Sequence, residues 1–186
     1  ARVPRWVQAN AWRPDAPEIT ARSLALRQWN LLGVHIGPTD VQRVDVPFPD
    51  DEVDFSRGDV VVTVQLELAG ANVSALDATD LKWTFSGEPR PGDMRDGGER
   101  AGQLLRGPLA KLPLASERKK DSIVGLAATT MVLPPAGDST LALFAVCPED
   151  DKEVTGRIAI IHGNRVLQTA GLTVGVGPTA AGSGLE

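Results

Sequence analysis

Apolar and polar residues alternate along several segments of this chain. In residues 59–68 (DVVVTVQLEL), each even-numbered position carries Val or Leu. From residue 61 the odd-numbered positions carry Val61, Thr63, Gln65 and Glu67, so three of these four side chains are polar. A period of two places the two sets on opposite faces of an extended strand. The segment therefore predicts a β-strand with one buried face and one solvent-facing side.

Similar segments, rich in β-branched and aromatic residues and bounded by Gly, Pro, Asp or Asn, recur along the chain. They are residues 5–12, 21–29, 31–37, 42–48, 80–87, 122–133, 139–147, 156–162 and 165–176. Helical alternatives are few, because 71–81 suggests only a short turn and Pro108 and Pro113 interrupt 102–120. We predict an all-β fold, an antiparallel immunoglobulin-like β-sandwich of about eight to ten strands with a long loop insertion.

Two segments lack periodicity and are predicted to be loops. Residues 86–102 are rich in Gly, Pro and charge, which suits either a partner-binding loop or a disordered insertion. Residues 47–59 are acidic but lack the regular oxygen-ligand spacing of a calcium loop, so we predict no metal there. We expect one domain over 1–176, with 86–121 as an insertion. A flexible, partly vector-derived tail over 177–186 suggests a piece of a longer multidomain protein.

Charge and composition exclude several classes of partner. The formal net charge of −5 disfavours nucleic acid, and the one dense basic cluster, residues 117–121, is predicted to be a solvated loop. No stretch approaches the ~18 consecutive apolar residues of a membrane helix. The single cysteine, Cys147, follows an apolar run, which indicates a buried structural thiol in a reducing, cytoplasmic setting.

The residues needed for catalysis or cofactor binding do not form a recognisable motif. The only possible histidine bases are His35 and His162, and no G-x-S-x-G motif or phosphate-binding glycine loop is present. Two distant histidines and one cysteine do not make a structural zinc site. We predict that the protein is not an enzyme and binds no cofactor or metal, with His35 on a strand surface. A serine or cysteine hydrolase using His162 or His35 stays open as an alternative.

Four tryptophans leave a second alternative open. They are Trp6, Trp12, Trp29 and Trp83. Three lie within alternating segments, which favours core packing, but aromatic rings exposed together would suit a carbohydrate- or ligand-binding β-sandwich. That alternative requires at least two tryptophans exposed in one concave patch.

The segment HGNRVLQT, residues 162–169, predicts a β-hairpin. Gly163-Asn164 is a two-residue loop between two strand-like segments, so these two residues are assigned as the structural turn. His162 then lies opposite Arg165. In the same register Ile161 faces Val166, Ile160 faces Leu167, Ala159 faces Gln168 and Ile158 faces Thr169.

Three residues of this hairpin are candidates for an interaction site: Arg165, Gln168 and His162. The turn explains most of the polarity in the segment, but Gln168 lies in mid-strand after Leu167. A buried amide either bonds a neighbouring loop or marks a contact surface, and the first interpretation is favoured.

The distributed motifs RWVQANAW (5–12), VHIGP (34–38), LPPAGDSTLALFAV (133–146) and TGRIAIIHGNRVLQTAGLTVGV (155–176) carry a family resemblance. Together they resemble a β-sandwich module of multidomain bacterial conflict and signalling proteins that accompanies caspase-like CHAT proteases or STAND ATPases. Arg165, Leu167 and Gln168 match that pattern. The resemblance implies a protein-association or sensing role, with catalysis in other domains. We expect docking at exposed strand edges and at 86–102.

Overall fold

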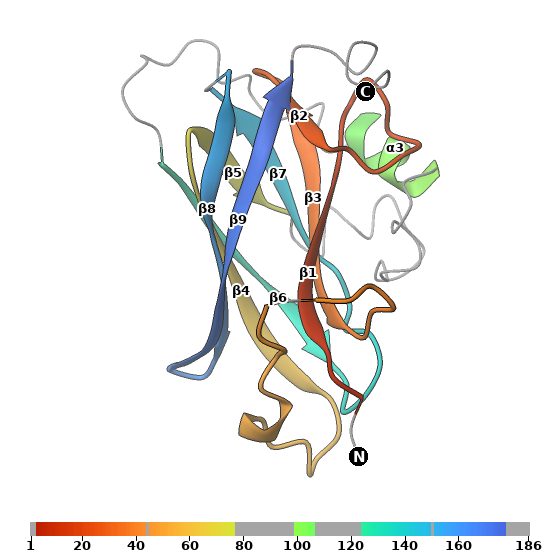
Figure 1. Cartoon of the computed structure of the whole chain (residues 1–186), viewed down its shortest axis with the longest axis vertical. Helices are drawn as coiled ribbons and strands as arrows, with labels where there is room; N and C mark the ends of the chain where they lie inside the picture. Colours follow the sequence, from red (N-terminus) through yellow and green to blue (C-terminus); the bar gives the residue numbers. More distant parts are fainter. Residues whose placement is uncertain (1–2, 44, 77–98, 107–123, 150, 178–186) are drawn as a thin grey trace.

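The computed structural model describes residues 3–43, 45–76, 99–106, 124–149 and 151–177, which form nine strands, one 3₁₀ turn and one α-helix. The elements are β1 (Trp6–Trp12), β2 (Ser23–Ala25), β3 (Asn30–Gly37), η1 (Asp50–Glu52), β4 (Val60–Ala69), β5 (Ala71–Ala75), α3 (Glu99–Arg106), β6 (Val124–Leu133), β7 (Ala142–Pro148), β8 (Glu153–His162) and β9 (Arg165–Gly177). Figure 1 shows the strands in two layers along the long axis of the molecule. No described helix is long and apolar enough to cross a membrane.

The strands form a four-stranded sheet in the order β1-β3-β7-β5 and a five-stranded sheet in the order β2-β9-β8-β4-β6. The predicted mostly-β fold is confirmed. The prediction of a wholly antiparallel arrangement is wrong at one pair, because β2 runs parallel to β9. The chain passes from β4 in one sheet to β5 in the other through Gly70 alone, so β4 and β5 link the layers directly.

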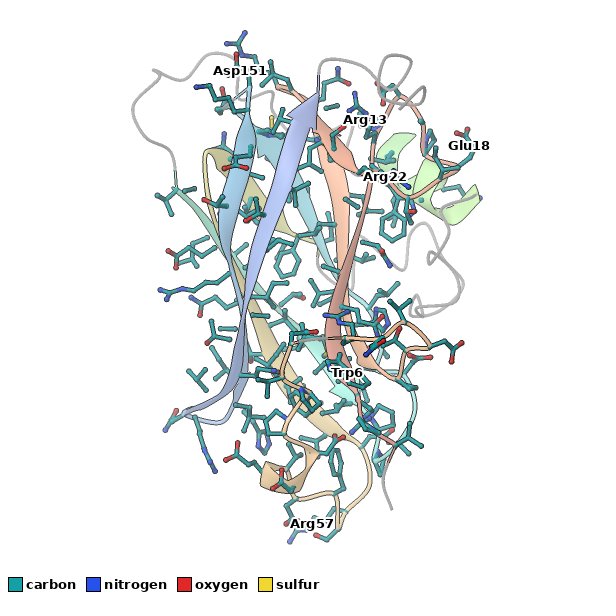
Figure 2. The ribbon with its side chains drawn as sticks, viewed as in Figure 1. Trp6, Arg13, Glu18, Arg22, Arg57 and Asp151 are labelled. Atoms are coloured by element: carbon teal, nitrogen blue, oxygen red, sulfur yellow. The ribbon has the colours of Figure 1, made fainter. Side chains whose placement is uncertain are left out.

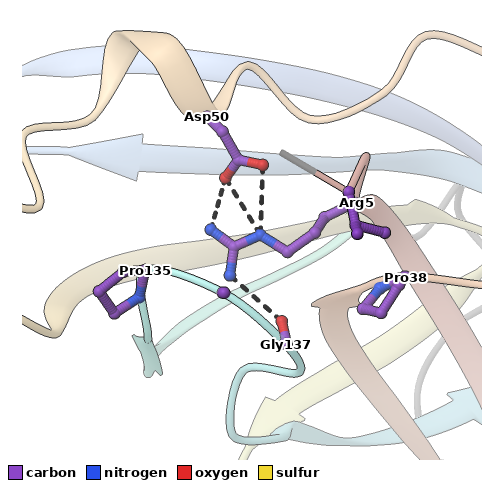
Figure 3. A pocket seen from close by; sticks show the side chains of 7 residues that line it. Arg5, Pro38, Asp50, Pro135 and Gly137 are labelled. Carbon is purple, nitrogen blue, oxygen red and sulfur yellow. Dashed lines mark hydrogen bonds and ion pairs between the residues drawn. The ribbon is translucent and has the colours of Figure 1, made fainter. Parts of the chain in front are cut away.

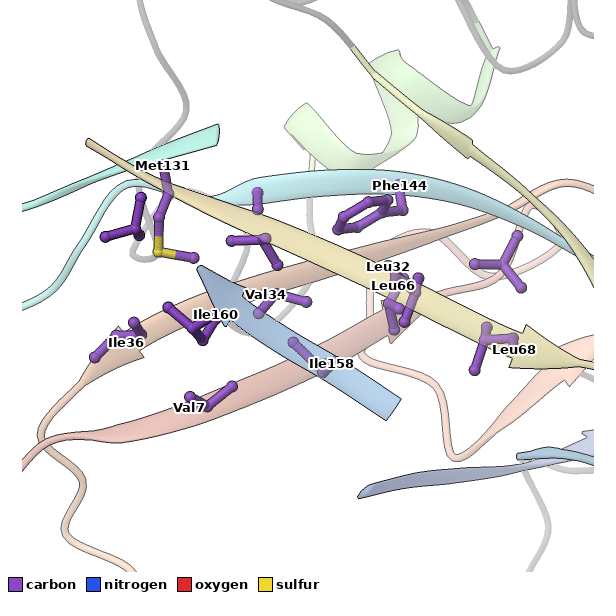
Figure 4. Close-up of a cluster of buried hydrophobic side chains, with 14 of the residues drawn as sticks. Val7, Leu32, Val34, Ile36, Leu66, Leu68, Met131, Phe144, Ile158 and Ile160 are labelled. Carbon is purple, nitrogen blue, oxygen red and sulfur yellow. The ribbon is translucent and has the colours of Figure 1, made fainter. Parts of the chain in front are cut away.

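One apolar core lies between the two sheets (Figure 4). The alternation predicted for 59–68 is confirmed, since Val62, Val64, Leu66 and Leu68 of β4 are fully buried. From the opposite sheet, Leu32, Val34 and Ile36 of β3 and Phe144 and Val146 of β7 pack into the same cluster. Each sheet therefore provides the apolar cover that the other sheet needs.

A second apolar cluster covers the outer side of the four-stranded sheet. Trp12 and Leu143 lie on this side, and a Cβ at Gly33 would lie only 3.2 Å from the Trp12 ring. Helix α3 adds Ala101, Leu104 and Leu105. These helical positions share one face, which lets a single short helix bury them.

Several predicted element boundaries require correction. The predicted loop 86–102 contains the start of α3, because the apolar face of residues 101–105 packs on the sheet. Residues 71–75 form β5 instead of a helical turn. Within 21–29 only 23–25 are strand, and the described residues of 42–48 form none. The predictions for 80–87, 117–121 and most of 177–186 lie outside the described residues, although β9 includes Gly177.

The buried side chain of Asn30 joins the two sheets. Its Oδ1 accepts the backbone N–H of Ala25 in β2 at 2.8 Å, and its Nδ2 donates to the Ala25 carbonyl at 3.1 Å. The same amide group also donates to the carbonyls of Gln28 and Val146 at 2.9 and 3.2 Å. Asn30 is fully buried, so these bonds satisfy backbone groups that have no access to water.

Replacing Asn30 should destabilise the fold strongly. Asn30→Ala would leave the Ala25 amide and the carbonyls of Ala25 and Val146 with fewer buried partners, which should lower the free energy of unfolding by about 2–4 kcal/mol. The measurement is chemical denaturation followed by tryptophan fluorescence. Gln28→Ala, which removes an exposed amide two residues away, is the matched control. Equal stability of the two variants would contradict the role given to Asn30.

Candidate functional site

The predicted hairpin is present, but its register differs from the predicted one beyond the two residue pairs next to the turn. His162 pairs with Arg165 and Ile161 with Val166, as predicted. Gly163 has φ +61°, which a glycine adopts without strain at the first central position of a hairpin turn. A β-bulge at Leu167 then pairs Ile160 with Gln168 and Ala159 with Thr169, so the predicted pairings of Ile160, Ala159 and Ile158 are wrong.

The bulge turns Gln168 toward the same side of the sheet as the buried Ile160. There Gln168 Nε2 donates to the carbonyl of Val46 at 3.0 Å. Arg165 forms an ion pair with Glu52 in η1 at 2.7 Å, whereas His162 is exposed at the tip of the hairpin. Two of the three candidate residues therefore contact the segment 46–52, which lies beside the hairpin.

The acidic segment around η1 is explained by its arginine partners. The buried Arg5 guanidinium forms an ion pair with Asp50, with Nε 3.1 Å from Oδ1, and its Nη1 donates to the carbonyl of Gly137 (Figure 3). The same Nη1 also donates to the carbonyl of Pro134. Arg5 Cζ also lies 5.5 Å from the centre of the Phe55 ring. Among the described residues no group of three metal-ligating side chains occurs. The side chain of Arg5 thus connects the start of β1 to η1 and to the 134–137 loop.

A cavity of about 460 Å³ lies beside the Arg5–Asp50 pair. Its other lining residues are Val3, Pro38, Pro135, Ala136 and Gly137. Because Asp50 already neutralises the guanidinium, the cavity offers no net charge to an anion. No tryptophan lines it, so it does not supply the aromatic platform required by the carbohydrate-binding alternative.

A second Arg–Asp pair lies on the same loop at the surface. Arg43 donates to both carboxylate oxygens of Asp45, at 2.7 and 2.6 Å, and reaches the Val7 carbonyl at 3.4 Å. The hydrogen bonds that Arg43 donates to Asp45 lower the pKa of the Asp45 carboxyl. The same hydrogen bonds raise the pKa of the Arg43 guanidinium. The carboxylate therefore stays ionised, and keeps the pair intact, to a lower pH than an isolated aspartate would.

The two histidines and the cysteine lie apart. His35 is buried, with Nε2 3.8 Å from Asp138 Oδ1, so the prediction of a strand-surface histidine is wrong. Cys147 is buried and forms no disulfide, as predicted. The β3–β7 register places His35 about six residues, or roughly 20 Å, along the sheet from Cys147. No Cys147–His35 dyad can form across that distance.

The tryptophans do not share an exposed patch in the described chain. Trp12 is buried, as the core interpretation predicts. Trp6 and Trp29 are half-buried, but Trp6 pairs with Gly37 at one end of β3 and Trp29 adjoins Asn30 at the other. Trp83 lies outside the described residues.

The strand edges expected to accept a partner are occupied in part. At β1, the carbonyls of Ala11 and of Arg5, which directly precedes the strand, accept the amides of Ala21 and Phe48, each at 2.7 Å. On β6, the Val132 amide donates to the Thr140 hydroxyl at 2.8 Å. Toward the start of β6, a Cβ on Gly125 would lie 2.5 Å from the Ala71 carbonyl of β5, so the two edge strands are in close contact. These edges are poorly suited to strand addition.

Among the described residues, no other element packs on the outward-facing side of β9, β8, β4 and β6, which we call the outer sheet face. Strand pairing arranges its side chains in rows. Its residues are Val61, Thr63, Gln65, Glu67, Ala69, Val124, Leu126, Ala128, Thr130, Val132, Glu153, Thr155, Arg157, Ala159, Ile161, Val166, Thr169, Gly171, Thr173 and Gly175. Four large apolar side chains of this face, those of Val61, Val124, Leu126 and Val166, are 56–59% exposed.

Charge is almost absent from the outer sheet face. Its charged residues in the described chain are Glu67 and Arg157, which lie directly opposite each other on β4 and β8 with 3.5 Å between Oε2 and Nη2, and Glu153 at the first position of β8. Figure 2 places the labelled charged residues Arg13, Glu18, Arg22, Arg57 and Asp151 toward the ends of the long axis. The face therefore carries few charges on a chain of net charge −5.

Sequence reasoning missed both Arg5 and the outer sheet face. Arg5 has no local motif, and its partners lie 45 and more positions away. The alternation does place Val61 on the solvent side of its strand. It does not tell which strands lie beside that strand, and the face is formed only by their combination. No family model, curated protein or solved structure matches the chain.

Gln168→Ala should loosen the segment that carries η1. Loss of the bond to the Val46 carbonyl should cost about 1 kcal/mol and raise amide exchange at Phe48, whose N–H is bonded to the Arg5 carbonyl. Hydrogen exchange measured with denaturation checks both effects, with exposed Gln42→Ala as control. Unchanged protection at Phe48 would show that Gln168 does not hold this segment.

Arg5→Lys should be poorly tolerated although it keeps the charge. A lysine ammonium cannot reproduce the fork to Asp50 together with the two carbonyl bonds, so the free energy of unfolding should fall by about 2–3 kcal/mol. Arg57→Lys, at an exposed arginine, is the control and should be neutral. Thermal or chemical unfolding compares the two; equal values would mean that the hydrogen-bond geometry of the guanidinium adds no stability beyond what an ammonium provides.

Proposed function

We propose that this chain is a non-catalytic protein-association module that binds its partner through the outer sheet face. The observation that carries the proposal is the combination of four exposed Val and Leu side chains on one face, whose centre carries charge only as the compensated Glu67–Arg157 pair. Large contiguous apolar areas on a soluble domain commonly mark interaction sites. The core of an interface is likewise depleted of charged residues.

The energetics suit association. Each of the four exposed apolar side chains still has more than half of its surface in water. Covering that surface is worth about 1 kcal/mol for each residue, which is enough to make the face the main source of binding energy. The Thr, Ala and Gly residues between them add a shallow surface that a partner can approach closely.

We also propose that the fold is an immunoglobulin-like β-sandwich and that it belongs to a larger bacterial defence or signalling protein. Two packed sheets with a shared core support the first part. The motifs around HGNRVLQT support the second by resemblance. In such a protein, Arg165 and Gln168 hold the loop beside the hairpin, and the neighbouring outer sheet face meets the partner.

The experiment is affinity capture with the tagged chain in an extract of the source organism. Leu126→Lys puts a charge on the outer sheet face and should abolish recovery of the partner, because burying an unpaired ammonium costs several kcal/mol. Ile19→Lys, also at a 59% exposed apolar residue but outside this face, should retain it. Equal capture by both variants would refute binding through the outer sheet face.

A further inference from the structure

We propose that the partner seated on the outer sheet face is a second copy of this chain, related by a two-fold axis. This inference rests on the proposed function, because it uses the same face. It adds the identity of the occupant and the arrangement of the two copies. Three properties of the face support it: its charge pattern, its shape and its area.

The charge pattern of the face is complementary to itself. Glu67 and Arg157 occupy neighbouring strands in the same row. Consider a two-fold axis that lies in the plane of contact, parallel to the strands and midway between β4 and β8. This axis exchanges β4 with β8 and places Glu67 of each copy over Arg157 of the other. Each ion pair then gains a second partner of opposite sign, with no like charges in contact. Elsewhere a chain of net charge −5 repels its own copy, so a face whose central charges compensate each other is the favourable place for self-association.

The same axis matches large side chains with small ones. In the row of Glu67 and Arg157, the outermost residues are Leu126 on β6 and Gly171 on β9. The axis exchanges β6 with β9, so the exposed Leu126 of each copy lies over Gly171 of the other. A Cβ at Gly171 would meet nothing within 4 Å in its own chain, which leaves space above it.

The area is sufficient for a specific but weak dimer. Four strands about 4.8 Å apart, over nine residues at about 3.4 Å each, give roughly 500 Å² per copy and about 1,000 Å² in total. This lies at the lower limit for specific interfaces, so we expect dissociation in the micromolar range or above. Because each copy uses the same face in a two-fold dimer, the assembly closes at two chains and forms no larger polymer.

The test uses charge reversal with sedimentation velocity between about 1 µM and about 1 mM chain. The unaltered chain should dimerise as concentration rises. Glu67→Arg alone brings four positive charges together across the axis, and Arg157→Glu alone brings four negative charges together. Each variant should self-associate at least about tenfold more weakly. A 1:1 mixture of the two should dimerise again, because every facing pair then has opposite signs.

Recovery in the mixture is the decisive outcome, because the pair within each chain stays mismatched and only contact between chains can restore it. Gly171→Arg, at a position with free space in the fold, should also prevent dimerisation, whereas Ile19→Arg should not. Circular dichroism checks that every variant is folded. A chain that stays monomeric over the whole range, or a mixture that does not recover, overturns this inference. Loss of capture in Leu126→Lys but not Ile19→Lys would still support the proposed function with a different partner.

Discussion

The shared apolar core between the two sheets is the constraint on which the rest of the structure depends. Leu66 and Phe144, from opposite sheets, are both fully buried in it. Because side chains alternate along a strand, burying one set fixes which residues point outward. The exposure of Val61, Leu126 and Val166 is thus a consequence of how the core is filled, and it leaves an outer sheet face with few charges on the side of the sheet opposite the core.

Two buried polar side chains order segments that the apolar core does not hold in place. Asn30 gives backbone partners to β2, the shortest strand, and connects it to the opposite sheet. Arg5 does the same for η1 and the 134–137 loop. Both are buried and satisfied, so they give a unique arrangement to segments that have little apolar surface of their own. Contacts at Phe48, Ala21 and Thr140 cover parts of the strand edges, which favours the sheet face as the surface for association.

Sequence reasoning worked where the information was local. The alternation in β4, the burial of Cys147 and the His162–Arg165 pairing each depend on neighbouring residues only. It failed where distant parts of the chain decide the outcome. His35 is buried although its local pattern suggested a surface position. The bulge at Leu167 arises in pairing with β8, and it places Gln168 where the bond to Val46 forms.

The sequence by itself determined that this protein is built of strands with one apolar side, because a period of two is written in neighbouring residues. Only the tertiary structure decided that β6 lies beside β4 and β9 beside β8, since strand order depends on contacts between distant segments. That order brings Glu67 opposite Arg157 and puts Leu126 and Gly171 in the same row. Each strand carries only part of this face, and the complete surface exists only in the folded sheet.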